Sequence, residues 1–267
     1  MIDKEKLVSR IDAEFLSRME IENDVWKIDA EGIHYWKLNR LLKVLNDNGA
    51  RKIELYNVYG QRYIGTNLKS EVDLEIYGTP GNDLGAFMDG PKIVVHGNVQ
   101  DCCGNTMNNG CIIVHGHAGD ITGYSMRGGK IFIRDNVGYR AGIHMKEYGD
   151  KKPCLVVSGT AQDFLGEYMA GGVVVILGLN LKSNERHKAR FVGTGMHGGV
   201  IYIHGEVTSI SKEAEIADLN EEDWKILYRL VREFCACFKF DADKILEQSF
   251  KKVIPLSHRP YGRLYAY

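Results

Sequence analysis

The sequence predicts an all-β solenoid, a parallel β-helix with a helical N-terminal cap and C-terminal helices. The first observation behind this prediction is a 19-residue spacing of glycines, each followed three positions later by a methionine. The pairs are Gly85/Met88, Gly104/Met107, Gly123/Met126 and Gly142/Met145, continued at wider gaps by Gly166/Met169 and Gly193/Met196. A fixed period in this range is typical of solenoids, in which each repeat buries its apolar face by stacking on its neighbours. We therefore expect the methionines to form an inward-facing ladder across consecutive coils.

The second observation is a short alternating apolar segment inside each repeat. β-Branched residues stand at the eighth and tenth positions after the repeat glycine, at Ile93/Val95, Ile112/Val114, Ile131/Ile133, Val174/Ile176 and Ile201/Ile203. Such alternation indicates a strand with one face inward. Because glycine corners flank this strand, 19 residues leave no room for a helix, and each repeat should be one coil.

The ninth position of each repeat should then face outward. It is occupied by large apolar residues, at Val94, Ile113, Phe132, Val175 and Tyr202. Such a stripe is more than a monomer normally leaves in water, so something should cover it. We expect the cover to be a helix over residues 221–238 of the same chain; a second copy or a partner subunit is the alternative.

The flanking segments divide the chain into residues 1–49, an α/β cap; 50–207, the β-helix; and 208–267, C-terminal helices with an extended tail. A helix over about 34–48, with Trp36 and four leucines on its apolar side, should cap the open end. Residues 52–58 and 71–77 alternate like opening strands. Downstream, Asn220 and Asp223 are typical of a helix N-terminus, and a short helix over 243–248 and an extended tail through residue 261 should follow.

The composition of the chain argues against several classes of function. With 34 basic and 35 acidic residues, the chain has no overall attraction for nucleic acid or an anionic membrane. We see no leader peptide and no 18-residue apolar run, so we expect a cytoplasmic protein. The six cysteines form no CxxC pair and no metal-knuckle spacing, and they are most simply reduced thiols.

Two motifs that could carry chemistry have simpler explanations. Gly193-x-Gly195-x-x-Gly198 matches a dinucleotide fingerprint, but that fingerprint must open a helix and here a strand should follow. His96 and His115 share the eleventh repeat position with Arg134, so the three should stack on successive coils. The cationic Arg134 argues against a shared metal, and a ladder of half-exposed polar residues is the simpler interpretation.

Three glycine-rich segments carry a family resemblance: residues 138–146 (GYRAGIHMK), 166–172 (GEYMAGG) and 193–199 (GTGMHGG). Together they resemble the glycine-repeat C-terminal domain of the glutamate synthase large subunit, over about residues 30–207. The resemblance implies a right-handed β-helix that carries no catalytic residue and packs against glutaminase and flavin domains. A more distant similarity is to the glycine-repeat subunit of formylmethanofuran dehydrogenase.

The resemblance implies a non-catalytic structural subunit of a glutamate synthase complex. Partner chains would supply the glutaminase and the FMN and iron–sulfur centres, and this chain would hold no cofactor and have no independent activity. This chain begins Met1-Ile2-Asp3, whereas the family's glutaminase uses an N-terminal cysteine. A formylmethanofuran dehydrogenase scaffold or, less favoured, an independent β-helix enzyme are the alternatives, and association between copies of the chain stays open.

No catalytic, cofactor-binding or metal-binding residue is assigned. Polar residues that the coil does not require suggest an interface. We expect partner contacts at Arg140, His144, Lys146, Glu167, Tyr168 and His197. A cluster of charges paired with one another is the alternative, and the basic loop 182–190 is a second place where an acidic partner could dock.

Overall fold

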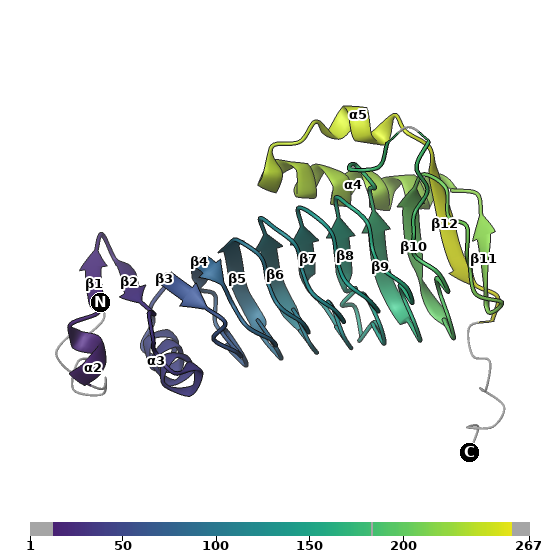
Figure 1. Cartoon of the computed structure of the whole chain (residues 1–267). Coiled ribbons are helices and arrows are strands. Elements are labelled where there is room, and N and C mark those ends of the chain that lie inside the picture. Colours follow the sequence, from purple (N-terminus) through teal and green to yellow (C-terminus); the bar gives the residue numbers. More distant parts are fainter. Residues whose placement is uncertain (1–12, 183, 258–267) are drawn as a thin grey trace, which may run out of the picture.

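The computed structural model describes residues 13–182 and 184–257 (Figure 1). Its helices are α2 (Ala13–Leu16), α3 (Tyr35–Asp47), α4 (Glu221–Phe238) and α5 (Ala242–Leu246). The opening strands are β1 (Met19–Glu22), β2 (Val25–Asp29), β3 (Lys52–Tyr59) and β4 (Asp73–Thr79). The repeat strands are β5 (Asp89–His96), β6 (Asn109–Val114), β7 (Lys130–Ile133), β8 (Cys154–Val157), β9 (Ala170–Ile176) and β10 (Gly198–His204). The closing strands are β11 (Ala214–Ala217) and β12 (Phe250–Pro255).

The described strands form one 12-stranded sheet in the order β1 to β10, then β12 and β11. Strands β2 to β10 pair in parallel with their sequence neighbours, one strand for each coil, which confirms the predicted β-helix (Figure 1). Antiparallel strands close both ends: β1 pairs with β2, and β12 pairs with β10. Residues 253–255, where the predicted extended tail begins, therefore belong to a sheet strand, and residues 258–267 lie outside the described part.

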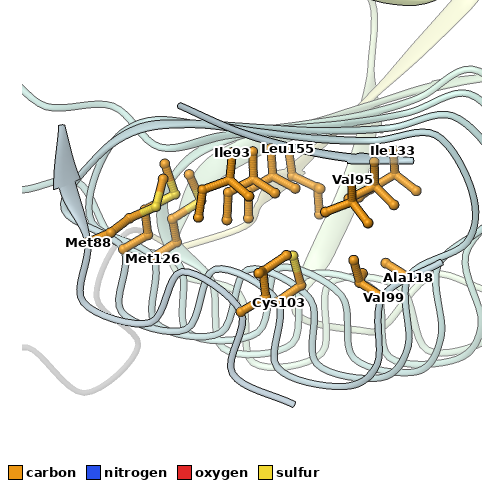
Figure 2. Close-up of a cluster of buried hydrophobic side chains, with 14 of the residues drawn as sticks. Met88, Ile93, Val95, Val99, Cys103, Ala118, Met126, Ile133 and Leu155 are labelled. Carbon is orange, nitrogen blue, oxygen red and sulfur yellow. The ribbon is translucent and has the colours of Figure 1, made fainter. Parts of the chain in front are cut away.

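The core runs along the inside of the coils, with the predicted methionine ladder at one corner. Met88, Met107, Met126 and Met145 are all fully buried, as are the inward strand residues at the eighth and tenth positions. Figure 2 shows Ile93, Val95 and Ile133 on the strand side facing Cys103, Val99 and Ala118 across the interior. Each coil thus fills its interior from both sides, and stacking continues the core from coil to coil.

Helix α3 caps the N-terminal coils, as predicted. Leu38, Leu41, Leu42 and Leu45 are buried in the solenoid core. Trp36 was also expected on the buried side, and this was wrong, since 49% of it is exposed. Trp36 is the second residue of α3 and lies in its first turn.

Helix α4 lies over the outer face of the repeat strands (Figure 1). Its residues Leu227, Leu230, Val231 and Phe234 form a second apolar cluster with the ninth-position residues of the coils. This confirms the predicted internal cover. The stripe under the helix also includes Val156 of β8. Asn220 and Asp223 form a reciprocal capping box at the start of the helix. In the described ranges, no helix is long and apolar enough to cross a membrane.

Candidate partner interface

The side of each coil opposite the strands is built from turns rather than from a second strand. Here the repeat glycine is the middle of three residues with positive φ, spaced two apart: Arg140 (56°), Gly142 (74°) and His144 (56°) in one coil. The two outer positions recur along the solenoid as two rows. The row before the glycine is Asp83, Cys102, Ile121, Arg140, Phe164 and Phe191, and the row after it is Phe87, Thr106, Ser125, His144 and Tyr168, followed by Gly195.

The backbone of these rows bonds to the next coil. The amide of Arg140 donates to the carbonyl of Asp163 at 3.0 Å, and that of His144 donates to Glu167 at 3.0 Å. Each left-handed residue costs roughly 1–2 kcal/mol, and the inter-coil hydrogen bonds offset this strain. The side chains are thereby fixed on the outer surface, which we call the turn face.

On the turn face of the last coils, two groups of side chains stack. In the first, Arg140 Nε donates to Glu167 Oε2 at 2.8 Å. The Arg140 guanidinium lies 5.2 Å from the centroid of the Phe164 ring. Phe164 in turn stacks on Phe191, with centroids 5.1 Å apart and planes 14° apart. Glu167 is buried, and its charge is balanced by the Arg140 guanidinium, which lies against the Phe164 ring.

The second group is aromatic. His144 stacks on Tyr168 with ring centroids 5.3 Å apart and planes 12° apart, and Tyr124 meets His144 edge-on at 6.0 Å. Tyr168 extends over the next coil, where a Cβ on Gly195 would lie 2.4 Å from its ring. Glycine at this position therefore leaves room for Tyr168. We call Tyr124, Arg140, His144, Phe164, Glu167, Tyr168 and Phe191 together the turn-face cluster.

A buried carboxylate beside the cluster anchors its last coil. Arg190 donates to Asp163 from its backbone amide at 2.9 Å, and from Nη2 at 2.7 Å and Nε at 3.1 Å. These hydrogen bonds from Arg190 lower the pKa of Asp163 below its ordinary value. Arg190 comes from the predicted basic loop, so that loop is tied to the coil at its C-terminal end.

Four of the six residues predicted as partner contacts come together: Arg140 with Glu167, and His144 with Tyr168. The other two lie at the neighbouring corner. His197 Nδ1 is 3.2 Å from the carbonyl oxygen of Gly195, and Lys146 is exposed. The sequence prediction missed Phe164, Phe191 and Tyr124. Phe164 and Phe191 stand two positions before a repeat glycine, where a comparison of the coils would have found them, whereas Tyr124 directly follows Gly123 and belongs to neither row.

The cluster is exposed at its rings. Tyr168 is 46% exposed, Phe191 is 47% exposed, and Tyr124 is 36% exposed. Helix α4 covers the strand face and leaves this side free (Figure 1). Aromatic residues and arginine are enriched in protein interfaces, because they supply large contact areas at low entropic cost. The arrangement suits binding of another protein.

The motifs set aside earlier have structural roles here. Gly198 begins β10, so a strand follows the glycine-rich fingerprint. His96 and His115 stack with centroids 5.2 Å apart, in a ladder that continues from Tyr56 and Tyr77 and ends on Phe238. Burial, with the charges of His96 and Arg134, lowers the pKa of His115. Among residues 13–182 and 184–257, no group of three or more His, Cys, Asp or Glu could hold a metal ion.

Comparison with known proteins identifies a family and a relative of this chain. The GXGXG motif family matches residues 36–256. An uncharacterized protein of Methanocaldococcus jannaschii is 48% identical over 248 residues, which cover 89% of this chain and 95% of that protein. The chain therefore belongs to the GXGXG motif family, the family of the C-terminal domain of glutamate synthase.

Proposed function

We propose that this chain is a non-catalytic structural subunit of a glutamate synthase complex in the cytoplasm. Partner chains would carry the glutaminase and the FMN and iron–sulfur centres and would form glutamate from glutamine and 2-oxoglutarate. Membership of the GXGXG family supports the class of complex. The observation that carries the proposal is the turn-face cluster, whose aromatic rings stay exposed although the charges of Arg140 and Glu167 are already paired with each other.

Reconstitution tests the proposal. The purified chain is mixed with the glutaminase chain and the FMN/iron–sulfur chain of the same organism, and the mass of the complex is measured by light scattering after gel filtration. We expect one complex containing all the chains, and glutamate formation from glutamine that falls when this chain is omitted. Separate elution of this chain, with the same glutamate formation in its absence, would refute the proposal.

A pair of variants tests whether the turn-face cluster is the contact. Tyr168→Ala should weaken the complex by about thirtyfold, as loss of a hot-spot aromatic costs about 2 kcal/mol. Phe87→Ala is the matched control, because Phe87 occupies the same row with positive φ and is 50% exposed but lies in an earlier coil. Equal affinities of the two variants would place the contact elsewhere.

The isolated chain should be inactive. Purified alone, it is expected to release no ammonia from glutamine and to be colourless, since catalysis and the coloured cofactors would belong to the partners. Ammonia release that scales with the concentration of the pure chain would contradict the proposed role.

A further inference from the structure

A groove lined by four lysines lies on the strand side, away from the turn-face cluster. It has a volume of about 670 Å³ and runs between the C-terminal half of α4 and residues of β5, β6 and β7. Lys92, Lys130, Lys151 and Lys152 line it. Its floor is apolar or weakly polar, formed by Cys111, Ile113, Phe132, Ala236 and Cys237. This volume lies in the range of small-molecule sites.

The strand register sets the spacing of two of these lysines. Lys92 of β5 pairs with Cys111 of β6, which pairs in turn with Lys130 of β7. Two strand spacings separate the lysine Cα atoms by roughly 10 Å. Both lysines stand at the seventh repeat position, next to the apolar stripe under α4. Their amino groups can therefore approach one bound molecule from both sides of Cys111.

The other two lysines come from an insertion that the coil does not need. The coil from Gly142 to Gly166 has 24 residues instead of 19, and the extra residues lie between Met145 and β8. This loop turns back across the earlier coils, since Lys151 Nζ lies 3.4 Å from Asp89 Oδ1 of β5. The insertion thereby carries Lys151 and Lys152 to the mouth of the groove.

Only part of this positive charge is neutralised. Lys130 pairs with Glu233 of α4, and Lys151 pairs with Asp89. In the part of the chain that the structure describes, Lys92 and Lys152 have no salt bridge. Unpaired ammonium groups in a concave site raise the local concentration of anions. Lysine is a common phosphate ligand, and the apolar floor adds a place for a ring.

We propose that this groove binds an organic phosphate of nucleotide size, with its phosphates at Lys92 and Lys152 and its ring on the floor beside α4. This site is independent of the proposed partner interface. Binding there would also connect α4 to the insertion loop, because the ligand would contact both.

Calorimetric titration of the full chain in magnesium-free buffer tests the proposal with three probes. Adenosine diphosphate carries both features, pyrophosphate only the charge and adenosine only the ring. We expect saturable binding of adenosine diphosphate, and binding of the other two weaker by about tenfold or more. Pyrophosphate binding as tightly as adenosine diphosphate, or no saturable binding of adenosine diphosphate, would overturn it.

Two matched variants locate the site. Lys92→Gln/Lys152→Gln should weaken binding of adenosine diphosphate by about tenfold or more while leaving the melting temperature unchanged, because both side chains are on the surface. Lys188→Gln/Lys212→Gln removes the same charge at exposed lysines outside the groove and should bind like the unmodified chain. Equal loss of affinity in both double variants would show attraction by net charge alone and would overturn the proposal.

Discussion

At the residue scale, the coil explains why only one of its three residues with positive φ must be glycine. A Cβ on Gly104 would point inward, 2.3 Å from Cδ1 of Ile131 in the next coil, whereas the positions two residues before and after carry outward side chains. The outer rows can therefore hold any residue that tolerates the left-handed conformation, including Arg140 and Tyr168. In this coil the fold requires the glycine, whereas the positions two residues before and after it are free to serve function.

Replacing Gly104 by alanine should therefore cost more than its backbone strain. Gly149→Ala is the control, since Gly149 also has positive φ, 58°, but an added Cβ would meet nothing within 4 Å. The control should lose about 1–2 kcal/mol of unfolding free energy from strain alone. Gly104→Ala should lose a further 1–3 kcal/mol or so from overpacking against the buried Ile131. Urea unfolding measures both, and equal losses would show that the coil can absorb the methyl group.

At the element scale, the outward strand position changes character where α4 ends. The residues that pair in register with the ninth repeat position are polar in the opening strands and apolar in the later ones. They are Lys27, Glu54 and Glu75, then Val94, Ile113, Phe132, Val156, Val175 and Tyr202. The apolar part coincides with the strands packed against α4, and the polar part lies beyond it. The change from polar to apolar residues along the strands thus coincides with the edge of the surface that α4 covers.

A charge on the inner side of α4 should undock the helix. Phe234→Asp buries an unpaired carboxylate beside Phe132, which costs several kcal/mol, so the apolar stripe should become exposed. We expect self-association by light scattering and rapid proteolysis within α4. Tyr228→Asp, on the same helix but 46% exposed, should remain monomeric and resistant. A monomeric, resistant Phe234→Asp variant would show that α4 does not keep the chain monomeric.

The first turn of α4 is fastened by Asp223, and this contact should make stability depend on pH. Burial alone would raise the pKa of Asp223, but hydrogen bonds from the Asn220 amide (2.8 Å), Lys252 Nζ (2.6 Å) and the Tyr202 hydroxyl (2.6 Å) together lower it. A folded-state pKa below the unfolded value means that the carboxylate stabilises the fold above about pH 4. This contribution is lost as the pH falls through the folded-state pKa.

Asp223→Asn should therefore lose roughly 3 kcal/mol at pH 7, because Lys252 is left nearly buried without its partner. The difference from the unmodified chain should stay constant between pH 7 and 5 and shrink below about pH 4. Glu222→Gln, in the same turn but exposed, should change stability little. Urea unfolding at pH 7, 5 and 3 measures the differences, and a loss that does not vary with pH would exclude the ionised carboxylate as its source.

The sequence predicted the regular coils. It did not predict the elements that follow an insertion or the strand pairing that closes the C-terminal end of the solenoid. Strand β8 was missed because the insertion before Cys154 shifts its apolar residues out of the 19-residue register. The pairing of β12 with β10 was missed because two helices separate these strands in sequence. Three of the seven turn-face residues were missed: Phe164 and Phe191 because their row imposes a backbone conformation and no residue type, and Tyr124 because it lies outside both rows. The 19-residue period predicts which residues each coil buries, but it does not predict which residues the coil exposes on its outer surface.

At the scale of the whole molecule, one apolar core runs from Phe15 near one end to Val253 at the other. In the core, the interior of each coil packs on the coils next to it, so a defect in a central coil divides the core into two short pieces. Each piece would keep one closed end and expose the core at the other. Because short arrays gain too few inter-coil contacts to offset their conformational entropy, neither piece should be stable alone.

Met126 lies in the middle of this core and is fully buried, so Met126→Asp should unfold the whole chain rather than one coil. Met126→Leu keeps the volume and should cost less than about 1.5 kcal/mol. Hydrogen exchange resolves the two ends: strands β3 and β10 should both lose protection in Met126→Asp and keep it in Met126→Leu. Persistent protection of either strand in Met126→Asp would mean that a half-solenoid is stable by itself, and that each end cap, not the length of the stack, holds the fold.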